Sequence, residues 1–396
     1  MAIRAFIAGL LVFTVADLTP VGLAAARHYT DAQVEKIHRS MLLIDTHNDI
    51  PSKTVDGLDI GKPSPDTDTD LPRLRAGGVG AVFFAAYVAG RYVQGNHSAH
   101  RALDMIDTIR HDIVARYPND FAFCTTPDQI VAAHKHHKIA ALIGIEGGHA
   151  IEDDPRLLRD YYALGVRYMT LTHSNTNNWA DSSGDIDNPA IKHHGGLTDF
   201  GKDVVREMNR LGMMVDISHV SDKTFWDALA VSDAPVFASH SSCRALTNVP
   251  RNMTDDMIVA LAKKGGVIDI NFACEFLSQK SADIGLKFWD RMDNAPTQAE
   301  RDAATAEYKR ETPRATLNDV VAHIDHAVKI AGINAVGIGS DFDGIDCTPA
   351  GLDDVSKFPN LTRALLEKGY SPSDIRKIYG GNFLRVMRAV EARAER

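Results

Sequence analysis

Residues 42–49 read LLIDTHND, an apolar run that ends in a histidine and two further polar residues. Side chains alternate between the two faces of a strand, so His47 and Asp49 project the same way. An apolar run with a polar end is typical of a buried parallel strand whose carboxyl end opens into a functional loop. We therefore interpret this stretch as the first strand of a parallel sheet.

Seven more runs of this kind follow along the chain, each a short β-branched or apolar segment before a loop rich in Gly, Asn, Asp or His. Helix-like stretches, with apolar residues recurring at three and four, separate them. The eight expected strands are 42–49, 79–87, 140–147, 166–173, 213–219, 235–240, 265–271 and 335–341. Eight strands that alternate with helices predict an α/β fold, a TIM (β/α)8 barrel.

Two segments extend this repeat. Residues 278–314 are polar and charged without a strand run, and they predict a helical excursion placed to cover the barrel mouth. Residues 361–394 predict extra C-terminal helices on the outside of the barrel. The hydrophobic fraction of 44% allows a large core, and we expect residues 27–396 to form a single domain.

Residues 1–26 have the layout of a signal peptide: Arg4, an apolar run from 5 to 16, and small residues up to 26. The run is shorter than the roughly 20 residues of a spanning helix, so we expect cleavage near Arg27, with an uncleaved anchor as the alternative. The expected protein is exported, periplasmic or secreted, and carries no stable membrane anchor. Its four cysteines allow three pairings, and the sequence does not choose among them.

The formal net charge of -9 and the lack of a Lys and Arg cluster argue against nucleic-acid binding.

Five metal-ligating side chains stand at strand ends: His47, Asp49, Glu146, His219 and His240. The carboxyl ends of barrel strands share one rim, so these groups should meet there. Imidazole and carboxylate ligands without thiolates suit Zn²⁺, with Mn²⁺, Co²⁺ and Fe²⁺ as alternatives. Five ligands exceed the needs of one catalytic zinc, so we expect two metals that share a carboxylate and hold a water, which is the source of a hydroxide nucleophile.

Two more strand ends carry polar side chains that suit a reaction at this rim. His173 could stabilise a developing oxyanion, and Asp341 could accept and return a proton. Taken singly, each would also fit a hydrogen-bonded structural position. Because both should lie at the same rim as the metal-ligating residues, we favour a catalytic role over a structural one.

Several motifs resemble those of the renal, or membrane, dipeptidase family of zinc peptidases, and the similarity runs from about Tyr29 to the C-terminus. The motifs are DTHND (45–49), GIEGGH (144–149), LTHS (171–174), WAD (179–181), SHSS (239–242), RN (251–252) and GSDFDG (339–344). The resemblance implies a barrel of the metal-dependent amidohydrolase type and, as is usual in the family, a homodimer.

The resemblance also implies roles for single residues. His47 and Asp49 would hold one Zn²⁺, His219 and His240 the other, and Glu146 with a water or hydroxide would bridge the two ions of each subunit. His173 corresponds to the carbonyl-side histidine, Arg251 to the arginine that grips the terminal carboxylate, and Asp341 to the acid/base that also contacts the amine.

The chain departs from mammalian members in two features. Asn175 stands where they place a cysteine, and no anchor signal follows the last helix. We therefore expect neither their lipid attachment nor their disulfides, and the chain resembles an exported bacterial member of the family.

The leading hypothesis is a zinc-dependent dipeptidase acting on free dipeptides, including those with a C-terminal D-residue. The alternative is a binuclear metal amidohydrolase for other amides, lactams or N-acyl amines, which would keep the metals and not need Arg251. A metal-binding protein without catalysis is a third hypothesis.

Overall fold

The computed structural model describes residues 28–293 and 295–395, so the expected signal segment 1–26 lies outside the described residues. Nine parallel strands are present within these ranges. They are β1 (Leu43–Asn48), β2 (Val79–Tyr87), β3 (Phe121–Phe123), β4 (Ile139–Glu146), β5 (Val166–Thr170), β6 (Met214–Asp216), β7 (Ala238–Ser241), β8 (Ile268–Ile270) and β9 (Val336–Ile338).

Eight of the nine strands curl into a ring around one axis. One sheet has the order β1-β2-β4-β5-β6, and a second has the order β7-β8-β9. Single parallel bridges connect the two sheets, one between Asp216 and Phe237 and the other between Asn48 and Phe342. The expected α/β barrel is confirmed, and every one of the eight expected strands is found.

The short strand β3 was not expected from the sequence. Its three residues pair with the amino-terminal half of β4, where Phe121 lies opposite Ile139. Three residues are too few to show a period-2 pattern, which explains why sequence reasoning missed the strand.

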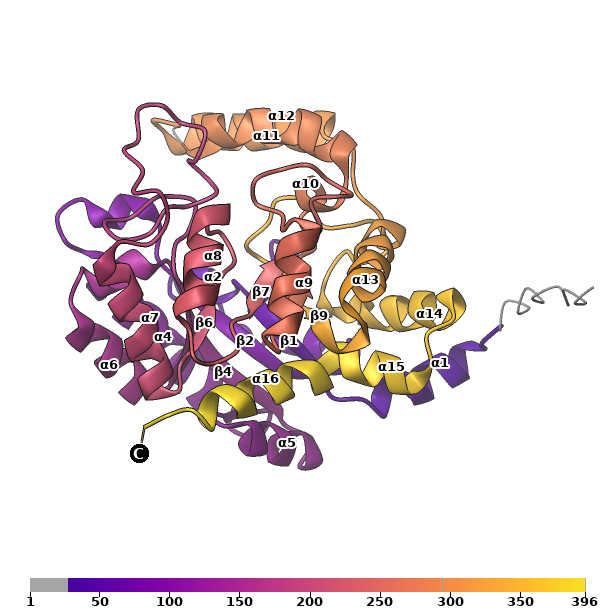
Figure 1. The fold of residues 1–396 in the computed structure, drawn as a ribbon. Helices are drawn as coiled ribbons and strands as arrows, with labels where there is room; N and C mark the ends of the chain where they lie inside the picture. Colours follow the sequence, from indigo (N-terminus) through magenta and orange to yellow (C-terminus); the bar gives the residue numbers. More distant parts are fainter. Residues whose placement is uncertain (1–27, 294, 396) are drawn as a thin grey trace, which may run out of the picture.

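Helices surround the ring and follow the strands in alternation (Figure 1). Those of the barrel are α1 (Asp31–Arg39), α2 (Pro51–Thr54), α3 (Leu71–Ala76), α4 (Ser98–Thr108), α5 (Pro127–Lys135), α6 (Pro155–Ala163), α7 (Asp199–Leu211), α8 (Asp222–Val231), α9 (Asp255–Lys263), α10 (Cys274–Leu277) and α13 (Leu317–Ala331). A π-helical segment, Ile109–Ala115, continues α4. Within the described part of the chain, none of these or the remaining helices is both long and apolar enough to cross a membrane.

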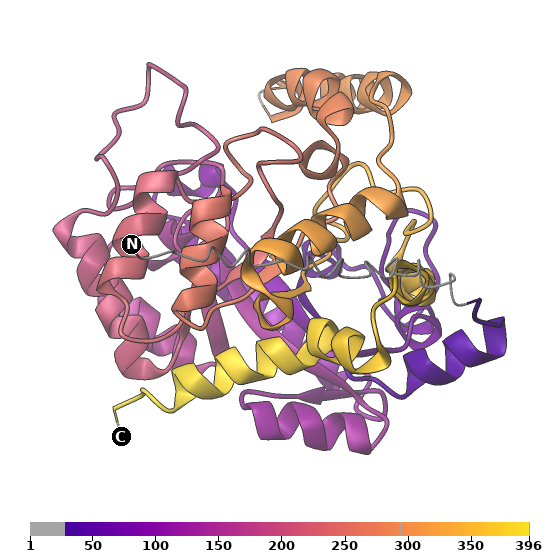
Figure 2. The same ribbon diagram turned by 45° about the vertical axis from the view of Figure 1, so that its right-hand side comes forward.

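The extra C-terminal helices are confirmed as α14 (Phe358–Lys368), α15 (Pro372–Arg376) and α16 (Asn382–Glu391). Figure 2 shows this stretch, in yellow, running along the lower side of the molecule. The ring of Phe383 in α16 lies 5.3 Å from that of Phe83 and 5.8 Å from that of Phe237, both inside the barrel. Helix α16 therefore covers the amino-terminal end of the barrel, and the carboxyl end is left for the site.

The helical excursion over 278–314 is confirmed as α11 (Gln279–Asp293) and α12 (Gln298–Glu311), which lie across the top of the molecule in both ribbon views (Figures 1 and 2). Helix α12 begins with a capping box, in which the backbone N–H of Glu300 donates to Thr297 Oγ1 and that of Thr297 donates to Glu300 Oε2. This pair satisfies two of the free donors at the helix start. We call α11 and α12 the cap.

A disulfide between Cys274 and Cys347 joins the first residue of α10 to the loop after β9. It selects one pair from the four cysteines, and Cys124 and Cys243 are buried free thiols. The bond ties together two loops that rise from neighbouring strands at the carboxyl end of the barrel.

Candidate metal centre and substrate cavity

A cavity of about 310 Å³ opens at the carboxyl end of the barrel, below the cap. Six of the expected site residues line it: Asp49, Glu146, His173, His219, Arg251 and Asp341. The other two, His47 and His240, are fully buried, and each lies within ion-pair distance of Glu146. The structure therefore brings all eight expected residues together.

The sequence predicted that His173, His219 and Asp341 are the last residues of their strands. In the structure they lie beyond the strand ends. Strands β5, β6 and β9 end three residues before His173, His219 and Asp341, respectively. The backbone of His219 has φ +65° and that of Asp341 has φ +64°. This left-handed conformation is incompatible with an extended strand, and it costs a non-glycine residue about 1–3 kcal/mol, a strain that is common at functional sites.

Glu146, the last residue of β4, stands at the centre of the group. Its Oε2 lies 3.5 Å from His47 Nε2, on the side of Asp49. Its Oε1 lies 2.9 Å from His219 Nε2 and 3.4 Å from His240 Nε2. The two oxygens of one carboxylate thus face two different groups of donors, which is the arrangement of a carboxylate shared by two cations.

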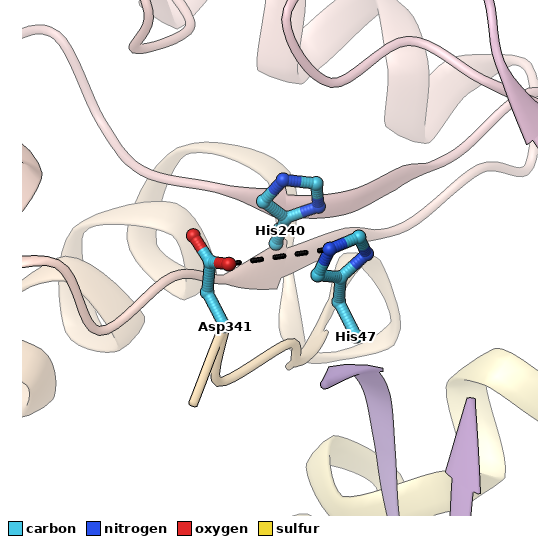
Figure 3. A group of neighbouring side chains, drawn as sticks. All are labelled: His47, His240 and Asp341. Carbon is cyan, nitrogen blue, oxygen red and sulfur yellow. Dashed lines mark ion pairs between the residues drawn. The ribbon is translucent and has the colours of Figure 1, made fainter. Parts of the chain in front are cut away.

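The two candidate ligand atoms near Glu146 Oε2 lack hydrogen-bond partners among the described residues. His47 Nε2 and Asp49 Oδ2 lie 3.2 Å apart, and within the described residues neither makes a hydrogen bond. Buried polar atoms are rarely left without partners, so this pair fits an ion better than a purely structural role. Figure 3 shows His47, His240 and Asp341 converging, with the 4.0 Å ion pair from His47 Nε2 to Asp341 Oδ1 as a dashed line.

Candidate ligand atoms gather in three groups whose members lie within 4.8 Å of one another. The groups are His47 with Asp49 and Glu146, Glu146 with His173 and His219, and His47 with His240 and Asp341. Nitrogen and oxygen donors of this kind fit zinc or a similar divalent ion.

The charge states of the buried groups agree with a cation site. Burial lowers the pKa of His219 and of His240 well below the usual value, so both rings are neutral, the form that binds a metal. Burial alone would raise the pKa of Glu146, but the nearby His47 and His173 outweigh it and lower that pKa. Burial opposes protonation of His47 too, yet Tyr168, Asp49 and Glu146 together raise its pKa well above normal. Around His47, the protein therefore favours a positive charge.

Two hydroxyl groups that sequence reasoning missed hold the histidines in place. Tyr168 OH lies 2.8 Å from His47 Nδ1 and donates to the carbonyl of Thr46. Ser239 Oγ lies 2.7 Å from His240 Nδ1 and donates to Asp216 Oδ2 at 2.6 Å. Because each hydroxyl gives its proton elsewhere, it accepts the Nδ1–H of its histidine and leaves Nε2 to face Glu146.

One signal for Tyr168 was present in the sequence. A side chain at Gly144, in β4, would place its Cβ 2.0 Å from the Tyr168 ring. Only glycine leaves room for the tyrosine to reach His47 across the barrel. The glycine in the otherwise apolar run 140–145 therefore marks a close approach.

Asp341 is held by Asn271, whose Nδ2 donates to Asp341 Oδ2 at 2.8 Å. Burial raises the pKa of Asp341 well above its usual value, and the charges of Asp49 and Glu146 add to the effect against the opposing charge of His47. Gly344 allows the two carboxylates to sit close, since a Cβ there would lie 2.4 Å from Asp49 Oδ2 and 2.5 Å from Asp341 Oδ1. A carboxyl group with a raised pKa suits transfer of a proton.

Arg251 comes from the loop between β7 and α9 and is buried. Its Nη1 donates to Ser241 Oγ at 2.7 Å and its Nη2 to the carbonyl of His240 at 2.6 Å. Its buried Nε makes no hydrogen bond with any described residue, and burial lowers its pKa to about 10. A guanidinium that is held by the protein and lines the cavity suits recognition of a carboxylate.

His173 lies at the edge of the cavity. Its Nε2 is 3.7 Å from Glu146 Oε1, and its ring packs against those of Tyr87 and His219 at 4.7 and 4.5 Å. Its side chain is 20% exposed, whereas the His47 and His240 side chains are 0% exposed, so His173 can reach a bound molecule.

Comparison with known families gives a match over nearly the whole chain. Residues 31–396 match the family model described as membrane dipeptidase, peptidase family M19. Among characterised sequences, the dipeptidase verJ of Clonostachys rogersoniana is 39% identical over 372 residues, which cover 90% of this chain and 86% of verJ.

Solved structures share the fold. The probable dipeptidase PvdM from Pseudomonas aeruginosa has a TM-score of 0.80 at 27% identity, over 92% of this chain and 99% of PvdM. A metallo peptidase from Rhodobacter sphaeroides, liganded with a phosphinate mimic of the dipeptide L-Ala-D-Ala, has a TM-score of 0.72 at 25% identity, over 88% of this chain and 99% of the other.

Proposed function

This chain belongs to the membrane dipeptidase family, peptidase family M19, and is a hydrolase; from that premise we propose that it is a zinc-dependent dipeptidase with two Zn²⁺ per subunit. The proposal rests on the two carboxylate oxygens of Glu146, which face different groups of residues. Oε2 lies toward His47 and Asp49, and Oε1 lies toward His219 and His240. These five residues would hold the ions, with Glu146 as the bridge.

When bound, the two ions would lower the pKa of a water so that it attacks near neutral pH, and they would polarise the peptide carbonyl. The protein's own residues supply the remaining functions. Tyr168 and Ser239 orient the His47 and His240 rings. The His173 ring would donate to the carbonyl oxygen of the substrate.

Asp341 would move the proton. With its raised pKa, it can take the proton of the attacking water and deliver it to the nitrogen that leaves as an amine. The Asn271 amide holds its Oδ2, so Oδ1 is the atom that faces the reacting centre.

Arg251 would grip the carboxylate at the end of the substrate. Together with recognition of the free amino group near Asp341, this contact restricts the enzyme to free dipeptides. We extend the proposal to dipeptides with a C-terminal D-residue, because the structurally similar metallo peptidase of Rhodobacter sphaeroides binds a mimic of L-Ala-D-Ala.

The test is hydrolysis of a panel of Gly-D-Ala, L-Ala-L-Ala, N-acetyl-Ala-Ala and Ala-Ala-amide, before and after chelation and after zinc is restored. Cleavage of the two unblocked dipeptides alone, lost on chelation and regained with zinc, is expected. Cleavage of the blocked substrates would instead favour an amidohydrolase for other amides, lactams or N-acyl amines.

We also propose that the protein is exported and forms a homodimer. The disulfide Cys274–Cys347 supports export, because such bonds persist in oxidising compartments. The dimer rests on resemblance to the family. Recovery of a protein beginning near Arg27 from the cell exterior or periplasm, and a solution mass of two chains, would support these two proposals.

A further inference from the structure

The lining of the cavity divides into a polar floor and an apolar wall. The wall consists of Ala273, Phe276, Trp289, Met292 and Ile345. We propose that these five side chains form a pocket for a bulky hydrophobic side chain at the C-terminal position of the dipeptide. This inference rests on the proposed dipeptidase function and adds the class of substrate that the site prefers.

The wall is continuous although it comes from three segments of the chain. Phe276 lies in α10, Trp289 and Met292 in α11, and Ile345 in the loop after β9. Trp289 packs with Phe276 and Ile345 in one apolar cluster and with Met292 in a second. The Phe276 and Trp289 rings meet edge to face with centroids 5.4 Å apart. An aromatic surface shaped in this way buries apolar groups well.

Three charged residues of the cavity lining lie at its rim. Lys53, Arg301 and Asp346 are exposed, whereas Ala273, Phe276 and Met292 are buried. Glu275, next to Phe276 in α10, is buried, and the Tyr308 hydroxyl donates to its carboxylate. With this acid engaged by the cap, the inner wall offers an incoming group mainly apolar contact.

The position of Arg251 decides which substrate residue meets the wall. Its guanidinium carbon lies 5.3 Å from the centroid of the Phe276 ring. If Arg251 grips the terminal carboxylate, the Cα that bears this carboxylate lies next to Phe276. The side chain on that same Cα, which belongs to the C-terminal residue, then begins at the wall.

The expected effect follows from burial of apolar area. A leucine or phenylalanine side chain that moves from water into such a pocket gains binding equivalent to about tenfold or more relative to glycine. A shortened Trp289 should lose most of this gain for large side chains and little for glycine.

The experiment measures kcat/KM of the zinc-loaded full-length protein for Ala-Leu, Ala-Phe and Ala-Gly, and for Leu-Ala against Gly-Ala. The variants are Trp289→Ala, Trp289→Phe and Ile284→Ala. Ile284 is the matched control because it packs within the cap on the same helix but does not line the cavity.

We expect the wild type to prefer Ala-Leu and Ala-Phe over Ala-Gly by at least about tenfold. Trp289→Ala should reduce this ratio about tenfold, Trp289→Phe should restore most of it, and Ile284→Ala should keep it. The ratio of Leu-Ala to Gly-Ala should change less in every variant.

Two outcomes would overturn the pocket while leaving the dipeptidase in place. One is equal turnover of Ala-Leu and Ala-Gly by the wild type, a measurement that does not depend on the folding of any variant. The other is a ratio that Trp289→Ala shifts no further than Ile284→Ala does. Failure to cleave any unblocked dipeptide would instead reject the proposed function itself.

Discussion

At the scale of single residues, three of the candidate site residues have a hydrogen-bond partner that fixes their direction. His47 depends on Tyr168, His240 on Ser239, and Asp341 on Asn271. The sequence identified the groups that can bind a metal because imidazoles and carboxylates at strand ends are unusual. It did not identify the hydroxyls, because Ser and Tyr are common in barrels and only their contacts distinguish them.

Loss of the Tyr168 hydroxyl should weaken metal binding. In Tyr168→Phe the His47 ring loses the acceptor for its Nδ1–H, and changes of this kind typically lower metal affinity about 10- to 100-fold. Zinc affinity, measured by competition with a chromophoric chelator, should fall by that factor. Tyr161→Phe is the control, since this tyrosine is equally buried but donates to the Ala150 carbonyl. Equal affinities in the two variants would show that Tyr168 does not orient the ligand.

Replacement of Arg251 should act on substrate binding. Removing a charge-assisted hydrogen bond costs about 1.5–3 kcal/mol, so Arg251→Ala should raise KM for Ala-Ala by about tenfold or more. Arg251→Lys should recover part of the loss, since it keeps the charge without the planar fork. Steady-state kinetics on both variants test this expectation. An unchanged KM would show that another group recognises the carboxylate.

At the scale of elements, the cap and the two disulfide-linked loops form one side of the cavity. Residues 273, 275 and 276 lie beside Cys274, residues 344–346 precede Cys347, and all six line the cavity. The helical character of 278–314 was predicted, because the segment is polar and has no strand run. Its contribution of Trp289 and Met292 to the cavity was not, because those residues also fit the core of a helical pair.

Docking of the cap should weaken at alkaline pH. Burial raises the pKa of Glu275 to about 7, against the opposing hydrogen bond from Tyr308, and Asp346 adds repulsion. Since this pKa lies above that of the unfolded chain, stabilisation by the contact is full at acidic pH and is lost as the pH rises through about 7. Hydrogen exchange in 298–311, corrected for intrinsic rates, should therefore accelerate between pH 6 and pH 8.

The variant Glu275→Gln separates this cause from others. It keeps an acceptor for Tyr308 but cannot ionise, so exchange in the cap should no longer depend on pH in this range. Glu311→Gln, an exposed change at the end of α12, is the control and should behave as the wild type does. If Glu275→Gln keeps the full pH dependence, ionisation of Glu275 is not the cause.

At the scale of the whole molecule, the two ends of the barrel differ in chemistry. Phe383 of α16 packs on aromatic rings inside one end, while the other end holds buried carboxylates and imidazoles. Such polar groups are costly to bury unless a bound ion offsets their charge. The site should therefore be the part of the fold whose stability depends on metal.

Chelation should lower the melting temperature of the whole protein. Ligands that bind only the folded state stabilise it by about 2.7 kcal/mol when free ligand is 100-fold above Kd, which for a chain of this size means a few degrees. Calorimetry with and without chelator, followed by zinc, should show a loss and a recovery. Glu146→Gln should show a much smaller shift. A wild-type melting temperature that does not respond to chelation would argue against ions at this site.

The sequence by itself determined the order of the eight strands, the helical excursion, the extra C-terminal helices and seven candidate site residues, while Arg251 came from the resemblance of its motif to the family. It could do so because period-2 and period-3.6 patterns and polar strand ends are local features. The tertiary structure alone decided that Cys274 pairs with Cys347, that Tyr168 reaches His47 past Gly144, and that Glu146 divides its oxygens between two groups. These facts depend on contacts between segments as far as 121 residues apart, which local patterns do not encode.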